Sequence, residues 1–400
     1  IAYLDGQAPA DAEAEAYGEV YDGRGKLLVP AFYNAHAHAP MTLLRGYAEN
    51  LPLQAWLNDM VWPFEAKMTP EDNYWATLLA CAEMARYGVV SFSDMYYATD
   101  ERVCAVVESG LKANICESEL YFEPKPFADY ASCAAVEEYV GKYHGAADGR
   151  ILIDYNIHAE YTSNPQTCKD IAAVVKEKGL RMHLHASETR SEHEECKQRH
   201  DGLTPIQYFA SIGVLDVPTT AAHCTWCEPA DFDIMVEKGV FAAANPASNM
   251  KLGSGYAPIP AMLERGVSVC LGTDGMASNN NHDMMQDLYL LALLYKGSTG
   301  DPSVVTPKQA LSAATEKAKI IAGGTDFIIK ERAGKFAPDL LIYPGFIPEL
   351  NTVTKENGVL RIGAAVPMNG ITAALKDDKA FCAIADAASD VGSPQIRAKG

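Results

Sequence analysis

Short apolar runs alternate with amphipathic stretches from about residue 29 to about residue 318. Eight of the runs have the length and composition of buried strands: Leu28–Ala35, Val89–Met95, Ala113–Leu120, Ile151–His158, Leu180–His185, Thr220–His223, Val240–Ala244 and Val267–Thr273. Segments with helical spacing or composition lie between or beside them: Glu71–Tyr87, Asp100–Ser109, Pro165–Lys178 and Pro260–Arg265. This alternation predicts an α/β fold, a closed parallel (β/α)8 or TIM barrel, although periodicity alone does not exclude an open doubly wound sheet.

Polar residues fall at the ends of these predicted strands. His36 and His38 follow the first strand, His185 closes the fifth, His223 closes the sixth, and Asp274 comes just after the eighth. The carboxyl ends of barrel strands converge on one face, so residues far apart in the sequence become neighbours there. We therefore expect these five side chains to meet.

Four of these side chains have the chemistry of metal ligands. In the His-x-His pair at residues 36–38, alternate residues at a strand end point the same way, so both imidazoles can address one centre. His185 adds a third imidazole and Asp274 an anionic oxygen. Such a set suits Zn²⁺ or Fe²⁺ and leaves room for a water. We expect His183, two residues before His185, to be buried and hydrogen-bonded rather than a ligand.

Composition narrows the choice of partner and compartment. The 400 residues are 48% apolar and 21% charged, and 52 acidic against 33 basic residues give a net charge of −19. That balance argues against nucleic acid or an anionic membrane as a partner. No apolar run approaches the roughly 20 residues that span a bilayer, and no signal peptide is recognised. Ten scattered cysteines are typical of reduced thiols, which predicts the cytoplasm.

Six motifs in the barrel region belong together. They are Val29-Pro30-Ala31-Phe32-Tyr33-Asn34-Ala35-His36-Ala37-His38, Leu43-Leu44-Arg45-Gly46, His185-Ala186-Ser187-Glu188-Thr189, Ala221-Ala222-His223-Cys224, Asn245-Pro246-Ala247-Ser248-Asn249 and Gly272-Thr273-Asp274-Gly275. On these motifs, residues 1 to about 318 resemble the amidohydrolase superfamily. The resemblance is to the branch of the methylthioadenosine/S-adenosylhomocysteine deaminases and their chlorohydrolase and guanine-deaminase relatives.

The resemblance implies a role for each polar residue. His36, His38, His185 and Asp274 would bind one divalent metal, Zn²⁺ first and Fe²⁺ second, which can lower the pKa of a bound water from about 15.7 to about 7. His223 would hydrogen-bond the resulting hydroxide or the oxyanion, and Asp274 would pass its proton to the leaving amine.

Glu188 would protonate a ring nitrogen of the substrate. The implied reaction is hydrolytic deamination of a purine nucleoside, purine base or related amino-heterocycle, with release of ammonia. The fourth predicted strand lacks the lysine of binuclear members, so the resemblance implies a single ion.

The substrate pocket is less well defined by the sequence. Trp56 matches an aromatic residue near the nucleoside in the deaminases, and Gln54 stands where they often have a ribose-binding Glu. Glu117 stands near a position that is Arg in some relatives, which argues against the carboxylate of S-adenosylhomocysteine. The candidate pocket residues, each equally open to a packing role, are Arg45, Gln54, Trp56, His158 and Glu160.

The sequence changes character from about residue 319. The segments 318–327, 347–350, 359–364 and 389–397 resemble the FAD-binding subunit of molybdenum hydroxylases, and a glycine turn at residues 322–326 could cradle a pyrophosphate. Only about 80 residues of that larger module are present, so we do not expect FAD to bind. The predicted domains are 1–28, a remnant of an N-terminal β segment; 29–318, the barrel; and 319–400, a partial FAD-binding-domain-like segment. Both ends look cut, and we expect the chain to be a fragment.

Three other functions stay open at this point. One is hydrolysis of another leaving group, such as chloride from a triazine. Another is an electron-transfer flavoprotein with a vestigial barrel. A non-catalytic scaffold is disfavoured because Glu188, His223 and Asp274 are all retained. A small heterocycle is the expected partner, and homo-oligomer formation is left open.

Overall fold

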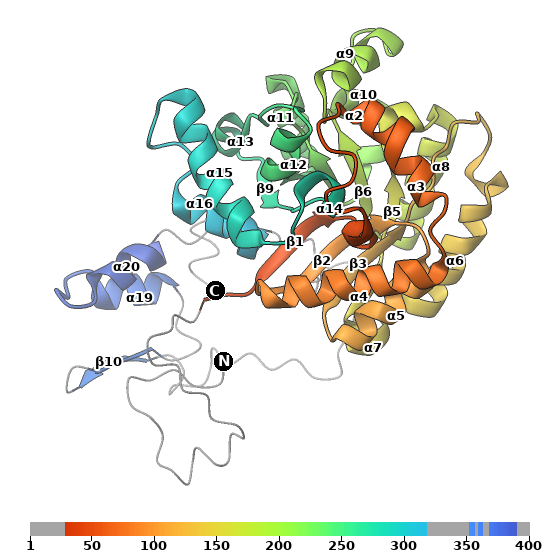
Figure 1. Ribbon diagram of the computed structural model, residues 1–400. Coiled ribbons are helices and arrows are strands. Elements are labelled where there is room, and N and C mark those ends of the chain that lie inside the picture. Colours follow the sequence, from red (N-terminus) through yellow and green to blue (C-terminus); the bar gives the residue numbers. More distant parts are fainter. Residues whose placement is uncertain (1–28, 318–351, 357–358, 363–367, 390–400) are drawn as a thin grey trace. The chain divides into compact units, whose positions relative to one another are not determined.

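A computed structural model describes residues 29–317, 352–356, 359–362 and 368–389 (Figure 1). The chain divides into two compact units, one of residues 29–326 and one of residues 1–28 with 327–400. The predicted N-terminal remnant at 1–28 lies outside the described residues. So do the predicted boundary at 318 and much of the segment that follows it, and the three predicted domains stay predictions.

The larger unit is built on parallel strands, most of which begin within two residues of the predicted positions. They form two ladders, β1 to β4 and β5 to β9, in sequence order. The strands are β1 (Phe32–Ala37), β2 (Val89–Tyr96), β3 (Lys112–Glu117), β4 (Ile151–Ile153), β5 (Tyr155–Ile157), β6 (Met182–Ala186), β7 (Thr219–His223), β8 (Phe241–Ala244) and β9 (Ser268–Leu271).

Backbone hydrogen bonds join the two ladders into a closed barrel. The predicted strand 151–158 is interrupted at Asp154, whose N–H donates to the carbonyl of Ile115 in β3 (3.0 Å), and Tyr155 then donates to Arg181 next to β6 (2.9 Å). β4 and β5 are thus two halves of one barrel position. At the other seam, the N–H of Asp274 donates to the carbonyl of His36 in β1 (2.9 Å). The predicted (β/α)8 barrel is confirmed.

Helices surround the strands (Figure 1). In the larger unit the α-helices of six residues or more are α4 (Pro70–Arg86), α5 (Thr99–Ser109), α6 (Ala131–Tyr143), α8 (Pro165–Lys178), α9 (Arg190–Arg199), α10 (Pro205–Ser211), α11 (Pro229–Lys238), α12 (Pro246–Lys251), α13 (Ile259–Arg265), α15 (Met284–Thr299) and α16 (Pro307–Ser312). The shorter α-helices and the 3-10 and π segments are η2 (Ala39–Leu44), α2 (Leu53–Ala55), η3 (Trp56–Val61), α3 (Trp62–Glu65), η4 (Phe127–Asp129), α7 (Ala146–Gly149), η5 (Glu160–Thr162), η6 (Val214–Asp216), α14 (Met276–Asn279) and η7 (Ala313–Lys317).

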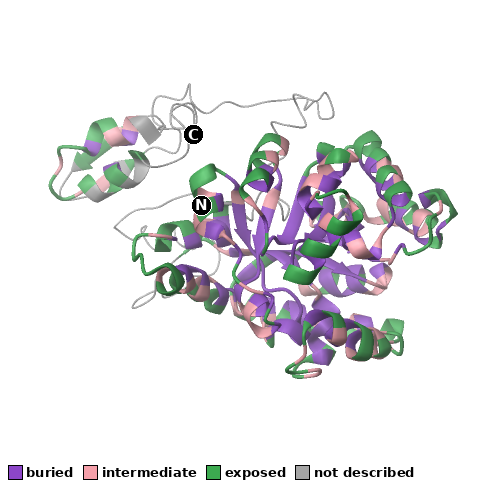
Figure 2. Cartoon of the chain, turned by 90° about the horizontal axis from the view of Figure 1, so that it is seen from above, coloured by how far each residue is buried: buried purple, intermediate pink, exposed green. Residues whose placement is uncertain are grey.

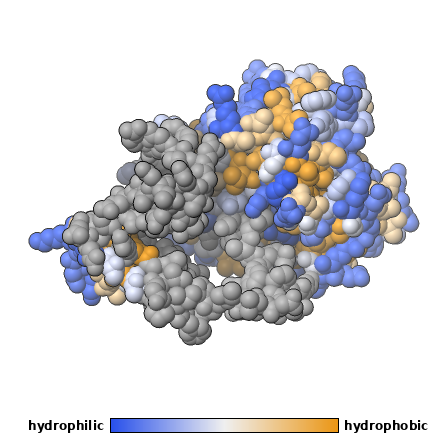
Figure 3. Space-filling model, turned by 90° about the horizontal axis from the view of Figure 1, so that it is seen from below, coloured by the Kyte–Doolittle hydropathy of each residue, from blue (hydrophilic) through white to orange (hydrophobic). Residues whose placement is uncertain are grey.

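Local sequence explains where several helices begin. Thr69 and Thr189 accept hydrogen bonds from the N–H groups of Asp72 and Glu192, three residues on, and both acidic side chains return the contact as capping boxes. The strands and the inner helix faces are buried while the outer faces are exposed (Figure 2). On the face shown in Figure 3, patches of apolar side chains lie among hydrophilic ones. No described helix is both long and apolar enough to cross a membrane.

The smaller unit is described only in part. β10 (Val353–Glu356) and β11 (Val359–Ile362) pair antiparallel, and α19 (Met368–Leu375) and α20 (Cys382–Ser389) follow. Ile371, Leu375 and Ala385 form an apolar cluster there.

Candidate metal and catalytic site

Three imidazoles and one carboxylate converge at the carboxyl ends of the strands. His36 lies on β1, His38 directly follows it, His185 lies on β6, and Asp274 follows β9. The Nε2 atoms of His36 and His38 lie 3.3 and 3.2 Å from Asp274 Oδ1. His185 Nε2 lies 3.4 Å from His38 Nε2, and the three histidines offer ligand atoms within 4.8 Å of one another. The structure therefore brings the whole predicted ligand set together.

The other ring nitrogen of each histidine is held by the barrel. His38 Nδ1 contacts the carbonyl of Met95 (2.5 Å), and His185 Nδ1 contacts that of His158 (2.7 Å). His36 Nδ1 lies 2.9 Å from His183 Nε2. These contacts turn all three Nε2 atoms towards one centre. His36 Nε2 is buried and makes no well-directed hydrogen bond. Its lone pair is therefore free to bind a cation.

Asp274 is fixed as an anion with one oxygen presented to the histidines. Its Oδ2 accepts hydrogen bonds from the hydroxyls of Ser248 (2.6 Å) and Ser278 (2.9 Å). Burial alone would raise the pKa of Asp274, but the close contacts of its carboxylate with His36 and His38 hold that pKa well below its ordinary value. Oδ1 is thus left as a charged ligand atom.

The histidine pKa values also fit a cation site. Burial lowers the pKa of His36 to about 4 and that of His185 well below its ordinary value. Burial also acts to lower the pKa of His38, but the Asp274 hydrogen bond raises it to about 9. A divalent cation would displace that proton, because a ligating imidazole is neutral. The four side chains fit a divalent metal in number, donor type and convergence.

Glu188 and His223 flank the ligand set. His223 Nε2 lies 3.7 Å from Glu188 Oε2, and His223 Nδ1 lies 2.8 Å from Asn249 Oδ1. The loop that carries Glu188 is held because the Glu192 carboxylate accepts the N–H groups of Ser187 (3.0 Å) and Glu188 (2.7 Å). Burial, followed by the charge of Asp274, raises the pKa of Glu188 to about 8. Glu188 is therefore largely protonated at neutral pH and can donate a proton.

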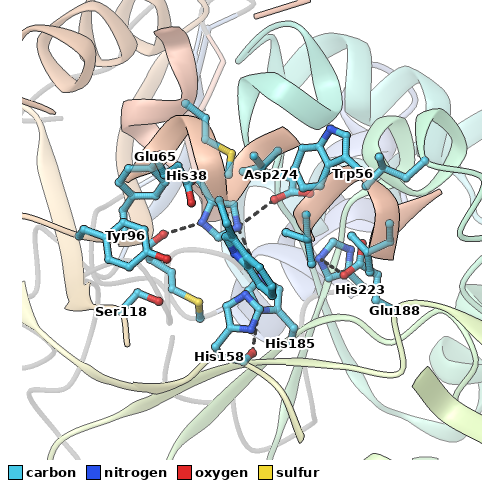
Figure 4. A pocket seen from close by; sticks show the side chains of 18 of the residues that line it. His38, Trp56, Glu65, Tyr96, Ser118, His158, His185, Glu188, His223 and Asp274 are labelled. Atoms are coloured by element: carbon cyan, nitrogen blue, oxygen red, sulfur yellow. Dashed lines mark hydrogen bonds and ion pairs between the residues drawn. The ribbon is translucent and has the colours of Figure 1, made fainter. Parts of the chain in front are cut away.

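A cavity opens beside these groups, with a volume of about 560 Å³ including its mouth. Figure 4 shows Trp56, Glu188 and His223 on one side of it and Glu65, Tyr96 and Ser118 on the other, with the imidazoles between. The lining residues are His38, Met41, Leu53, Trp56, Leu57, Val61, Trp62, Glu65, Met95, Tyr96, Tyr97, Ser118, His158, Tyr161, His185, Glu188, His223, Leu252 and Asp274. The size and the mixture of aromatic and polar walls suit a small heterocycle.

Two of the five predicted pocket residues line this cavity and three do not. Trp56 and His158 are in the wall. Arg45 is outside because its guanidinium pairs with Glu83 (2.5 Å) and reaches the carbonyl of Asn280.

Glu160 and Gln54 are also outside the wall. The Glu160 carboxylate is occupied by Arg199 (2.5 Å) and His200 (2.7 Å). Gln54 is exposed, and its side chain hydrogen-bonds Tyr161.

Glu117, which was expected to repel a substrate carboxylate, does not line the cavity. Its carboxylate turns away from the cavity and accepts hydrogen bonds from the N–H (3.1 Å) and hydroxyl (2.6 Å) of Thr99. The carboxyl that does line the cavity is Glu65, at the end of α3, and sequence reasoning missed it. Tyr96 and Ser118 were missed too, although their places at the ends of β2 and β3 could have indicated them.

The convergent histidines and aspartate beside a cavity at the end of the barrel are the arrangement of a metal-dependent hydrolase. Comparison with known proteins identifies the family. The chain belongs to the amidohydrolase family, whose model matches residues 27–328. The model of the FAD binding domain in molybdopterin dehydrogenase matches residues 301–400.

Several curated proteins are similar to the chain over most of its length. The 5-methylthioadenosine/S-adenosylhomocysteine deaminase of Dictyoglomus thermophilum is 41% identical over 340 residues, covering 84% of this chain and 78% of that protein. The 5'-deoxyadenosine deaminase of Methanothermobacter thermautotrophicus is 41% identical over 310 residues, covering 77% and 70%.

Solved structures agree with the barrel. An adenosine deaminase from Xanthomonas campestris, solved with bound zinc, superposes with a TM-score of 0.68 at 31% identity, over 74% of this chain and 67% of that one. A guanine deaminase from C. acetobutylicum has the same TM-score at 19% identity over 74% of each chain, which shows the fold alone.

Proposed function

We propose that the protein is a metal-dependent aminohydrolase that removes the amino group of a purine nucleoside, a purine base or a related amino-heterocycle and releases ammonia. The observation that carries the proposal is the placement of the Glu188 carboxyl and the buried His223 imidazole beside the ligand set in the cavity wall. The deaminase names of the relatives, at about 40% identity, support the same reaction.

The proposed metal is one zinc ion, held by His36, His38, His185 and Asp274. The zinc in the similar adenosine deaminase structure supports this choice, and Fe²⁺ is the second candidate because the same donors suit it. When bound, such an ion makes water a competent nucleophile near neutral pH.

The protein's own groups move the protons. Glu188, protonated because of its raised pKa, donates to a ring nitrogen and makes the adjacent carbon more electrophilic. Asp274 takes a proton from the attacking water and delivers it to the leaving amine. His223, neutral because burial lowers its pKa, hydrogen-bonds the oxygen that develops charge. One water is consumed and one ammonia leaves.

The test is ammonia release by the zinc-loaded full chain from adenosine, 5'-deoxyadenosine, methylthioadenosine and guanine. We expect release from at least one of them, loss of release on treatment with a chelator, and recovery with zinc. Asp274→Asn is the matched inactive control. Halide release from a chlorotriazine without ammonia from any purine would contradict the proposal.

The remaining assignments also stand as proposals. The cytoplasm is supported by the cysteine content. The C-terminal segment from about 319 is proposed to be FAD-binding-domain-like, and FAD is not proposed as the cofactor of the reaction. A metal-free preparation that retained bound flavin would contradict the deaminase proposal.

A further inference from the structure

Two cysteines lie together just after the end of β7, directly behind His223. Cys224 and Cys227 are both free and both buried. The N–H of Cys227 donates to the carbonyl of Cys224 (3.4 Å), so residues 224–227 form a tight turn. Such a turn holds its first and last Cα atoms within about 7 Å, and a disulfide spans about 4.4–6.8 Å between Cα atoms. The backbone therefore already holds this pair close to the spacing of a disulfide.

The two sulfur atoms also contact each other. A hydrogen bond with Cys224, together with burial, raises the pKa of the Cys227 thiol well above its ordinary value. Cys227 is therefore held as a thiol at neutral pH, and the reduced pair is stable until an oxidant reaches it. Two cysteines separated by two residues are also the spacing of redox-active dithiols.

The turn is joined to both groups that are proposed to handle protons. His223 immediately precedes it, and the φ angles of His223 (70°) and Cys224 (50°) are positive, a backbone conformation that residues with side chains adopt at a cost. On its other side, the N–H of Trp226 donates to the carbonyl of Ser187 (3.0 Å). Ser187 directly precedes Glu188. A shift of this turn is therefore felt by His223 and by the loop that carries Glu188.

Formation of a disulfide would move the turn. An S–S bond is about 2.05 Å long, so two sulfur atoms in non-bonded contact must approach by more than about 1 Å to form it. The strained backbone at His223 leaves little freedom to absorb that movement, and the ring is held by its contact with Asn249 (2.8 Å). Figure 4 shows this ring beside Glu188 at the cavity. A misplacement of about 1 Å at a reacting group can cost about 10²-fold in rate.

We propose that Cys224 and Cys227 are a reversible redox pair, and that oxidation of the pair to a disulfide by hydrogen peroxide lowers the deaminase activity by displacing His223. The loss of activity rests on the proposed function, whereas the disulfide itself does not. Disulfides in reducing compartments are usually transient and redox-sensing, which is the role assigned to this pair.

The oxidation takes place in two steps. The sulfur of Cys227, whose side chain is the more exposed of the two, attacks one oxygen of the peroxide. The O–O bond breaks, one water leaves, and a sulfenic acid remains on Cys227. The sulfur of Cys224 then attacks the Cys227 sulfur, the S–O bond breaks, the S–S bond forms, and a second water leaves. The two thiols lose two electrons and two protons, and the peroxide takes up both.

The experiment treats the zinc-loaded full chain with hydrogen peroxide, removes the excess with catalase and divides the sample. One half is alkylated and digested with trypsin without reduction; cleavage after Arg199 and Lys238 gives a peptide with Cys224 and Cys227 as its only cysteines. We expect mass spectrometry to find this peptide unalkylated and lighter by two hydrogen atoms.

The other half is assayed for ammonia release from the purine that the untreated protein deaminates fastest. We expect kcat to fall about 10- to 100-fold. Treatment with dithiothreitol, followed by reloading with zinc, is expected to restore it, because thiol–disulfide exchange reopens the bond.

Variants locate the source of the reversible loss, each compared with its own untreated sample. Cys227→Ser cannot form the bond and is expected to show no loss that dithiothreitol restores. Cys224→Ser is expected to behave in the same way and covers the case in which Cys227→Ser does not fold, since a hydroxyl can keep the hydrogen bond to the carbonyl of Ala221 (3.5 Å). Cys104→Ser, which removes an exposed thiol on α5, is the matched control and is expected to respond to peroxide as the wild type does.

Each outcome decides the inference. A treated wild type in which both cysteines of the peptide are still alkylated overturns the redox pair. A mapped disulfide with unchanged ammonia release, or an equal reversible loss in wild type and Cys227→Ser, overturns the effect on His223 and leaves the proposed function standing. If the untreated protein releases ammonia from no purine, the proposed function fails and the predicted loss of activity fails with it, while the mapped peptide still decides the redox pair.

Discussion

Replacing Glu188 by Gln separates the chemistry of the site from its contribution to stability. The side chain is 6% exposed, and burial raises its pKa from the ordinary 4.5 to about 8. An amide of the same shape cannot donate a carboxylic proton, so we expect kcat to fall by about 10²–10⁴. The same change also removes an ionisable group whose charged form is disfavoured by burial in the folded protein.

The gain in stability follows from proton linkage. The folded state binds this proton more tightly than the unfolded state. The free energy of unfolding of the wild type therefore decreases as the pH rises from about 4.5 to about 8 and does not decrease further above about pH 8. At about 1.36 kcal/mol per pH unit, the full difference amounts to about 5 kcal/mol. Gln has no such dependence, so Glu188→Gln is expected to be the more stable protein above about pH 8.

The assay is urea unfolding followed by circular dichroism at about pH 5 and about pH 8.5. Metal-free protein is used, because a bound cation would itself favour the carboxylate. Glu195→Gln on the exposed surface of α9 is the control, with no pH-dependent difference expected. A Glu188→Gln variant that is less stable than wild type at the higher pH, or that keeps wild-type turnover, would refute the reasoning.

Further predictions concern the groups around the ligand set. His183→Leu removes the acceptor of the His36 Nδ1–H and is expected to weaken zinc binding about 10- to 100-fold in a chelator competition, whereas His183→Gln retains most of the affinity. Ser248→Ala frees one side of Asp274 and is expected to lower kcat about tenfold with little change in KM, measured by steady-state kinetics. For wild type, kcat/KM is expected to fall with rising pH as Glu188 loses its proton; a profile that stays flat to about pH 10 would argue against Glu188 as the acid. Arg45→Gln is expected to leave KM unchanged, since the side chain lies outside the cavity lining.

The barrel and the ligand set could be predicted because both depend on local pattern. The carboxyl ends of the strands in a closed barrel form a single face. Once the strands are recognised, His36, His38 and His185 are therefore expected to lie close together on that face. The strand boundaries were predicted less accurately. β1 begins at Phe32, where it first pairs with Val89 of β2, and not at Leu28 as predicted. Asp154 divides one predicted strand in two, which apolar content alone does not indicate.

The pocket wall could not be predicted in the same way. Arg45 and Glu160 have the right chemistry, but partners 38 and 39 residues away, Glu83 and Arg199, take up their charges. Such pairing depends on how helices pack around the barrel and leaves no mark in local spacing. Glu65 comes from a short helix that follows the irregular η3 segment, so only the folded chain places it at the cavity.

The most direct test of the central claim is an anomalous scattering measurement at the zinc edge on crystals of the zinc-loaded, catalytically active chain. We expect one peak within about 2.0–2.3 Å of a nitrogen of His36, His38 and His185 and of a carboxylate oxygen of Asp274. An active crystal with no peak at that position, or with its zinc bound elsewhere, would contradict the account.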